Sequence, residues 1–417
     1  MAPSNVTVSA MRFLILVNII LRNLLRHRRR STVAILSVGF GIAALVVASG
    51  FIEWMFVDFR EATIESQYAH VQLTRPDYHE SGRADPFRYL LPEDSVAAPL
   101  DKLAHVRSWG PRLGFTGLVS RGDSTVSFVG EGYNPASDLT GDRSLRIVAG
   151  KKLASADRNK VMLGKGLATQ IGAKPGDPVI LLVDNPGSGL NAADATVAGI
   201  FESVSKAYDD SAILVHIGAA RTLLKVSGAH GWLVYLDDTD NTAAAARDLR
   251  AGFDSKQFEV RTWDQLAEFY ARAVDLFRQQ LDVVRFIVIA IILLGISNTM
   301  MMSVMERTGE IGTSMALGIK RRALLGQFVL EGGLIGVIGG LGGLTLAFLI
   351  GLGIDIMHIE MPPPPGLTRG YIAHVLITPG IVAESMLIAV ATTTLASLYP
   401  AWKASRMVIV DAIRQNK

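Results

Sequence analysis

The stretch ERTGEIGTSMALGIKRR, Glu306 to Arg322, lies between two long apolar segments and carries both signs of charge. Residues 286–305 before it and residues 332–354 after it contain no charged side chain, so each segment is long enough to cross a bilayer as a helix. The six charged residues of the stretch would cost roughly 3 kcal/mol each at the membrane centre. The stretch is therefore expected to be an aqueous loop between two membrane-spanning helices.

The composition agrees with a membrane protein that also has polar parts. The chain has 417 residues, 49% of them hydrophobic, a mean hydropathy of +0.32 and a formal charge of only +3. Its basic residues gather beside apolar segments, at residues 26–30 and 320–322. That placement is typical of cytoplasmic flanks of membrane helices, so membrane orientation is favoured and nucleic acid is not expected as a partner.

Several kinds of chemistry are excluded by what the sequence lacks. There is no cysteine, which excludes disulfides, thiolate metal sites and cysteine nucleophiles. The eight histidines are scattered without a His-Glu-x-x-His pattern, so no metal site is expected. No Gly-Lys-Ser or Gly-Lys-Thr occurs, so the chain has no phosphate-binding loop and we expect no cofactor in it.

We predict a membrane α-helical protein with four transmembrane helices and a large α+β extracytoplasmic domain inserted between the first and second spans. Four crossings put every basic cluster, and both termini, on the cytoplasmic side of a bacterial inner membrane. The predicted parts are a basic amphipathic helix at 1–31, spans at 32–57, 281–305, 328–354 and 379–402, the extracytoplasmic domain at 58–280, a cytoplasmic loop at 306–327, an outer Pro-rich loop at 355–378 and a cytoplasmic tail at 403–417.

The first helix is expected to lie on the cytoplasmic leaflet. Between Met11 and Arg26, polar residues recur at four-residue spacing among apolar ones, as Asn18, Arg22 and Arg26. The alternative is a simple extension of the first span. The two interpretations differ little for function.

The extracytoplasmic segment shows alternating patterns that predict strands and short helices. Residues 116–133 predict two strands around the turn Arg121-Gly122-Asp123. Further strands are predicted at 160–163, 179–183, 195–201, 212–216, 232–236 and 258–262, and helices at 165–171, 219–225, 242–249 and 263–280, the last running directly into the second span. No catalytic set stands out, and Asp209 and Asp210 are interpreted as solvated loop residues. A binding or force-transmitting domain is favoured over an enzyme.

Residues within the spans suggest how the helices pack. The third span contains nine glycines, among which Gly332, Gly336 and Gly340 form two small-xxx-small repeats that allow close approach of another helix. Asn298 in the second span is interpreted as an interhelical hydrogen bonder. Three acidic residues are candidates for an intramembrane function, although a structural role near an interface is favoured: Glu53, Glu331 and Glu384.

From Gly295 to Asn416 the chain resembles the FtsX-like family of ABC transporter permeases, especially its macrolide-exporter (MacB) and lipoprotein-releasing (LolC/LolE) branches. The resemblance is carried by several short motifs in the family's order: Asn298-Thr299-Met300, Glu306-Arg307, Glu310-Ile311-Gly312, Ala316-Leu317-Gly318, Glu331-Gly332, residues 399–405 and residues 411–414. The segment 58–280 is similar more loosely, through Gly176-Asp177 and residues 197–201.

This resemblance implies a role for the opening stretch. In the family, the loop between the second and third spans forms a coupling helix that docks onto an ATPase subunit. The implied ATPase-facing set is Glu306, Arg307, Glu310, Ile311, Met315, Leu317 and Lys320. The alternative is that Glu306 and Glu310 only solvate a loop.

The resemblance also implies partners. An ABC-type ATPase subunit that binds ATP and Mg is expected in trans, because this chain begins almost directly at its basic helix. A second permease copy or paralogue is expected to form a dimer with it. Membrane lipid, and a periplasmic carrier or adaptor, complete the expected partners. In lipoprotein releasers a hook recruits the carrier; residues 182–195 occupy a comparable place but are short.

Two main functions follow from the resemblance. The first is extraction or export of an amphiphile, with a lipoprotein favoured over a macrolide-like or lipid cargo. The second is a mechanotransmitting signalling permease that activates an extracytoplasmic partner such as a cell-wall hydrolase. The large extracytoplasmic segment favours the first. In neither case is the chain itself expected to be an enzyme.

Overall fold

The computed structural model describes residues 28–82, 85–101, 103–135, 145–185, 189–203, 205–362 and 370–407. The chain divides into a helical unit, Met1–Phe56, Asp275–Ile359 and Ile372–Lys417, and an α+β unit, Val57–Val274 and Glu360–Tyr371. Three predicted features lie wholly or partly outside the described residues: the amphipathic helix at 11–26, residues 363–369 of the Pro-rich loop and residues 408–417 of the tail.

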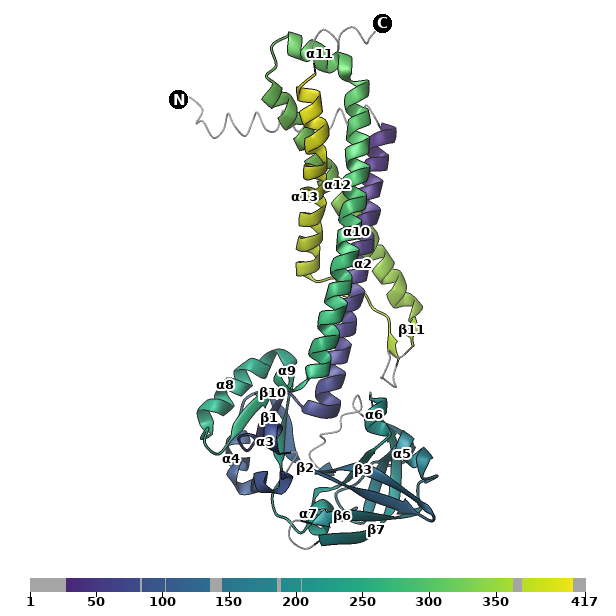
Figure 1. Ribbon diagram of the computed structural model, residues 1–417, viewed down its shortest axis with the longest axis vertical. Coiled ribbons are helices and arrows are strands. Elements are labelled where there is room, and N and C mark those ends of the chain that lie inside the picture. The colour runs from purple at the N-terminus through teal and green to yellow at the C-terminus, as the bar shows by residue number, and fades with distance from the viewer. Residues whose placement is uncertain are drawn as a thin grey trace. The chain divides into compact units, whose positions relative to one another are not determined.

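Four long helices make up the helical unit (Figure 1). They are α2 (Arg28–Thr63), α10 (Glu268–Glu306), α12 (Arg321–Met357) and α13 (Pro379–Ser405), and the short helix α11 (Thr308–Ala316) joins α10 to α12. The first two continue beyond the helical unit into residues of the α+β unit. Each of the four long helices contains an apolar stretch long and hydrophobic enough to cross a membrane.

Contacts among these helices form a closed bundle. The Ser297 hydroxyl of α10 donates to the Ala396 carbonyl of α13 at 2.9 Å. Gly41 of α2 lies against Ile292 of α10. A single buried cluster draws on all four helices and on α11.

The α+β unit contains one continuous sheet with the strand order β10-β1-β9-β2-β3-β8-β5-β7-β4, while β6 pairs with both β2 and β7. Its strands are β1 (Val71–Thr74), β2 (Val106–Arg121), β3 (Ser124–Tyr133), β4 (Arg146–Gly150), β5 (Lys160–Gly164), β6 (Pro178–Asn185), β7 (Gly189–Glu202), β8 (Ala212–His216), β9 (Gly231–Leu236) and β10 (Glu259–Thr262). A separate pair joins β11 (Glu360–Met361) to β12 (Tyr371–Ile372).

Short helices fill the connections. They are the π-helix η1 (Ile64–Tyr68), the 3-10 helices η2 (Pro86–Tyr89), η3 (Glu93–Ser95) and η5 (Thr239–Asn241), and the α-helices α3 (Tyr78–Ser81), α4 (Ala97–Leu100), α5 (Lys165–Gln170), α6 (Lys206–Asp209), α7 (Ile217–Leu224), α8 (Thr242–Gly252) and α9 (Trp263–Leu266).

Pairing of β6 with β2 closes part of the sheet into a ring. The strands β2, β3, β8, β5, β7 and β6 each pair with the next, and β6 returns to β2 between Gly117 and Ser120. Alternate side chains point inward and form one aliphatic core, to which α5 and α7 contribute. Of the other described strands, β4 pairs with β7 alone, whereas β10, β1, β9 and the start of β2 form an open sheet whose core is shared with α8.

Most predicted elements of this unit are confirmed, and two predictions are wrong. The turn at Arg121-Gly122-Asp123 joins β2 to β3, with Gly122 at φ 58°. The helix predicted over 263–280 is broken at Ala267, where φ is −86° and ψ is 60°, so α10 begins only at Glu268. Asp209 is buried rather than solvated. Both of its carboxylate oxygens accept the Ser203 N–H, at 2.9 and 3.1 Å, which compensates for the loss of water.

Candidate functional site

Local contacts define both ends of α11. At its start the Thr308 hydroxyl donates to the Met305 carbonyl at 2.7 Å, which satisfies a carbonyl at the end of the preceding helix α10. At its end Gly318 adopts φ 93°, and the N–H groups of Gly318 and Ile319 donate to the carbonyls of Met315 and Ser314. This is a Schellman ending, which needs a residue that tolerates positive φ. The loop between α10 and α12 is therefore an ordered helix.

The two faces of α11 have different roles. Ile311 and Met315 are buried in the bundle core, in one cluster with Leu324 and Phe328 of α12. These two residues were expected to face an ATPase, but the structure places them inward, where their burial holds α11 against the helix bundle. Of the predicted ATPase-facing residues, four are exposed: Glu306, Glu310, Leu317 and Lys320. Leu317 is 82% exposed.

A buried charge pair fastens this segment to the third long helix. Arg307, 11% exposed, lies 3.6 Å from the Glu331 carboxylate of α12, which is 7% exposed, and 3.5 Å from Glu310. The Arg307 guanidinium also lies 6.0 Å from the Phe328 ring centroid. Glu331, a candidate for an intramembrane function, is thus the partner of Arg307. Removing one partner of such a pair leaves an uncompensated buried charge, which typically costs about 3–5 kcal/mol.

A second ion pair joins the beginning of α2 to the end of α10. Arg30 and Glu306 contact each other through Nη2 and Oε1. Together with Arg307 and Glu331, this pair ties the start of α11 to α2 and α12. These two pairs therefore join residues of α2, α10 and α12 around the start of α11.

The other acidic candidates have different surroundings. Glu384 of α13 pairs with Arg285 of α10 at 3.0 Å, and Arg285 also pairs with Asp282. Glu53 is exposed on α2. The three acidic residues therefore do not form one site.

The predicted small-residue face of α12 packs against α13. A Cβ added to Gly332 would lie 2.6 Å from the Ser397 hydroxyl, and one added to Gly336 would lie 2.3 Å from the Thr393 hydroxyl. At Gly340 the nearest atom is the Met386 sulfur, at 2.8 Å. Asn298, in contrast, is exposed on α10 and forms no hydrogen bond that the described residues reveal.

Sequence reasoning missed a second glycine seam. Gly339 and Gly343 of α12 face α2, where an added Cβ would meet Val38 at 2.7 Å and the Gly39 carbonyl at 2.6 Å. Their four-residue spacing is the same signal that identified the first seam, displaced around the helix. The partners Arg30, Phe328 and Arg285 were also missed, because pairs far apart in sequence have no local pattern.

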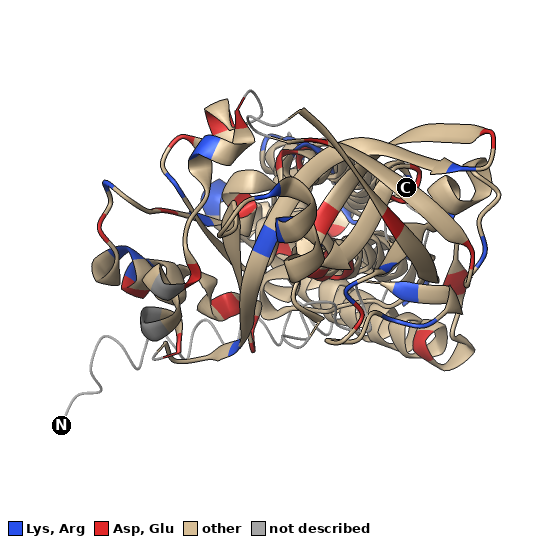
Figure 2. Cartoon of the chain, turned by 90° about the horizontal axis from the view of Figure 1, so that it is seen from below, with Lys and Arg blue, Asp and Glu red and all other residues tan. Residues whose placement is uncertain are grey.

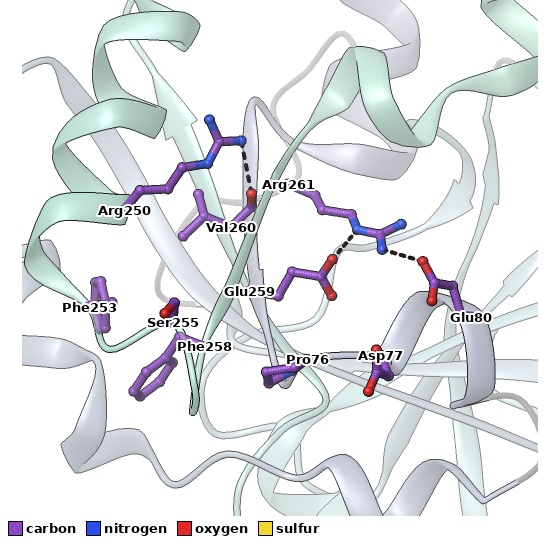
Figure 3. A pocket seen from close by; sticks show the side chains of 10 residues that line it. All are labelled: Pro76, Asp77, Glu80, Arg250, Phe253, Ser255, Phe258, Glu259, Val260 and Arg261. Atoms are coloured by element: carbon purple, nitrogen blue, oxygen red, sulfur yellow. Dashed lines mark hydrogen bonds and ion pairs between the residues drawn. The ribbon is translucent and has the colours of Figure 1, made fainter.

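The α+β unit contains a cavity of about 400 Å³ beside β10 (Figure 3). Arg261 bridges Glu259 and Glu80, the latter at 2.9 Å, while Arg250 donates to the Val260 carbonyl at 3.1 Å. Phe253 and Phe258 line its other side. Most of the charged side chains at this cavity are paired within the unit, so its lining is neither mainly positive nor mainly negative.

Charge elsewhere on the unit is mixed as well. Among the described residues, Lys and Arg are interspersed with Asp and Glu (Figure 2). Within the same described ranges, no group of three His, Asp or Glu side chains is arranged to hold a metal ion. Residues 306–320 of the helical unit, which are held by the Arg30–Glu306 and Arg307–Glu331 pairs and are called the clamped segment here, remain the candidate site.

Comparison with protein families identifies both parts of the chain. Residues 31–251 match the MacB-like periplasmic core domain, and residues 283–409 match the FtsX-like permease C-terminal domain. The chain belongs to this family of ABC transporter permeases. The permease has the two parts that the family pairs, and the second match includes the clamped segment around α11.

Two relatives agree with this assignment. The permease is 23% identical to the lipoprotein-releasing system transmembrane protein LolC of Xylella fastidiosa, over 94% of this chain and 96% of LolC. It is 30% identical to the macrolide export ATP-binding/permease protein MacB of Hyphomonas neptunium, over 54% of this chain but only 34% of MacB. The crystal structure of the periplasmic region of MacB from Actinobacillus actinomycetemcomitans gives a TM-score of 0.36 at 15% identity, covering 48% of this chain and 92% of that one.

Proposed function

We propose that this permease couples ATP hydrolysis by a separate ATPase subunit to motion of its α+β unit, and thereby extracts a lipoprotein from the inner membrane. The α+β unit is proposed to be periplasmic, inserted between the first and second spans, and both termini cytoplasmic. The chain itself is proposed to be non-catalytic, with ATP and Mg bound by the ATPase. A second permease copy or a paralogue completes the pathway.

The observation that carries the coupling role is the clamped segment at α11. Its buried face and the Arg307–Glu331 pair fasten it to the bundle, while Glu310, Leu317 and Lys320 project outward. An exposed Leu flanked by charges of both signs suits a protein partner, since apolar anchors supply affinity and a charged rim supplies specificity. ATP is proposed to bind to that partner, because residues 1–417 contain no Gly-Lys-Ser or Gly-Lys-Thr.

Support for a lipoprotein cargo comes from the extent of similarity. LolC is matched over nearly its whole length, whereas the MacB relative is matched over about a third of its own. The α+β unit offers a closed barrel and an open sheet, but neither its charge pattern nor its cavity favours a small ionic substrate. A cargo recognised mainly through its acyl chains would instead contact the apolar surfaces of α2 and α10.

The test places a photo-crosslinking amino acid at Phe286 of α10, an exposed position in the proposed outer half of the bundle, in native membranes. Leu395 of α13, exposed in the proposed inner half, is the matched control. An acylated polypeptide attached at residue 286 and absent at 395 supports extraction. A cell-wall hydrolase on the α+β unit, with no acylated adduct at either position, would overturn it in favour of signalling.

A further inference from the structure

The open sheet and the barrel of the α+β unit share one strand, β2, and Arg112 lies where this strand changes partner. Arg112 is paired with Gly231 of β9, and the next residue, Leu113, is already paired with Gly132 of β3. The backbone of β2 therefore forms the joint between the two parts. A side chain at this position can set the angle between them.

Arg112 contacts groups from both sides of the joint. Its Nη1 donates to the Gln67 carbonyl at 2.5 Å, and its Nε lies 3.0 Å from the Glu131 carboxylate of β3. Glu131 in turn accepts a hydrogen bond from the Tyr208 hydroxyl of α6 at 3.3 Å. One guanidinium thus joins η1 to the barrel.

The contact at Gln67 has a particular meaning because of where that residue lies. Gln67 belongs to η1, the wide π-helical turn that follows α2 directly. Carbonyl groups at the end of a helix lack intrahelical donors and carry partial negative charge, so a cation there is stabilising. Arg112 therefore supplies the donor that this helix end needs.

The two tyrosines near the Arg112–Glu131 ion pair carry no charge. Burial raises the pKa of Tyr208 and of Tyr235, so both phenols stay protonated and Tyr208 remains a donor to Glu131. An arginine keeps its charge under all physiological conditions. The Arg112 guanidinium that lies 3.0 Å from Glu131 is therefore always a cation.

We propose that Arg112 is the positioning residue that fixes the barrel relative to the open sheet and ties both to the turn ending α2. Any role of Arg112 in passing motion between α2 and the barrel rests on the proposed function. Its positioning role rests only on these contacts. Arginine is required because its fork reaches two acceptors in different directions. A lysine has one nitrogen and can hold Glu131 or Gln67, but not both with the same geometry.

The test uses the full-length chain, which contains no cysteine and so accepts specific labels. Spin labels at Leu190→Cys in the barrel and Ala244→Cys on α8, both exposed positions, report the distance between the two parts by pulsed electron resonance. One narrow distance is expected for the native residue at 112. Arg112→Gln should give a broad distribution, Glu131→Gln should broaden it similarly, and Arg112→Lys should lie between.

The matched control is Arg121→Gln on the same strand. Arg121 pairs with Asp177 at 2.8 Å and has similar exposure, 36% against 30% for Arg112, but both of its partners lie within the barrel. Arg121→Gln should leave the distribution of spin-label distances narrow. A narrow, unchanged distance in both Arg112→Gln and Glu131→Gln, with tryptophan fluorescence showing native packing, would overturn the proposal.

A second readout separates this proposal from the proposed function. With the ATPase bound, Arg112→Gln should retain ATPase stimulation and lose lipoprotein release, whereas Arg112→Lys should recover part of the release. If the chain that keeps Arg112 does not release lipoprotein either, the proposed function is overturned. If Arg112→Gln still broadens the distance distribution in that case, the positioning role stands.

Discussion

The helical unit and the α+β unit pack their elements together differently. In the helical unit the long helices approach one another at glycines, at Gly336 against α13 and at Gly343 against α2. In the α+β unit the contacts are made where side chains are large, such as Leu163 and Phe128 in the barrel. Helices in lipid gain little from hiding apolar surface from water, so they depend on close packing. A domain in water gains from every buried methylene.

This difference predicts different responses to a change in side-chain size. Removing carbon atoms should damage the barrel core of the α+β unit most, whereas adding one should damage the helical unit at the glycines between its helices. Four experiments test or refine this comparison, and they are ordered by their expected effect on stability.

The largest effect is expected for Leu163→Ala. Leu163 is fully buried in the barrel core, and such a truncation typically costs about 2–5 kcal/mol because a cavity remains. Thermal unfolding followed by tryptophan fluorescence should show a clear fall in Tm. The control is Leu190→Ala at an exposed position, which should change the free energy of unfolding by less than about 0.5 kcal/mol. Equal effects of the two would contradict a packed barrel.

A somewhat smaller effect is expected for Gly343→Ala, at about 1–3 kcal/mol. The new methyl would lie 2.6 Å from the Gly39 carbonyl, a backbone atom that cannot turn away. Its neighbour Gly342 has nothing within 4 Å of an added Cβ, so Gly342→Ala is the matched control. Size-exclusion profiles after heating in detergent should separate the two variants. If Gly342→Ala were the worse of the pair, the seam with α2 would be wrong.

Mild acid should destabilise the α+β unit by a smaller amount. Burial lowers the pKa of His70 and of His230 to about 4, so both are neutral when folded at pH 5.5, whereas an unfolded histidine binds a proton below about 6.5. The unfolded state then holds more protons, and stability falls as the pH drops from about 6.5 toward 4. The loss at pH 5.5 is about 1 kcal/mol for each histidine.

Substitution provides the check on this pH dependence. His70→Asn and His230→Asn should flatten the curve of Tm against pH, even if they lower Tm at neutral pH. His105→Gln, at an exposed position, should leave the slope unchanged. A slope unaffected by either of the first two variants would argue against burial of neutral histidines.

The smallest effect on stability is expected for Glu310→Lys and Leu317→Asp, within about 0.5 kcal/mol, because both positions are exposed. Their effect on coupling should instead be large, with loss of ATPase co-purification and of ATPase stimulation. Asp248→Lys on α8 is a charge-reversal control at another exposed position. Unchanged coupling in both test variants would show that the outward face of α11 does not contact the ATPase.

The sequence predicted the features that depend on short stretches of chain. An apolar run of sufficient length specifies a span, and alternating side chains around Gly122 specify a hairpin. The barrel could not be predicted, because its closure depends on β6 pairing with β2, about sixty residues earlier in the chain. The inward face of α11 was ambiguous for a related reason: Ile311 and Leu317 are both aliphatic, and only the position of Phe328 decides which one is buried.

The capped edge of the open sheet has a consequence for any cargo. The outward Val260 carbonyl of β10 is occupied by Arg250, and the Thr262 N–H donates to the Gln265 side chain at 3.2 Å. The barrel has little free edge where β6 closes it. Unfolded polypeptides adhere to proteins mainly by adding a strand to such edges. The β10 edge and the closed barrel therefore leave an extended polypeptide few backbone groups to pair with, and β4, which among the described strands pairs with β7 alone, is the edge where a strand could still add.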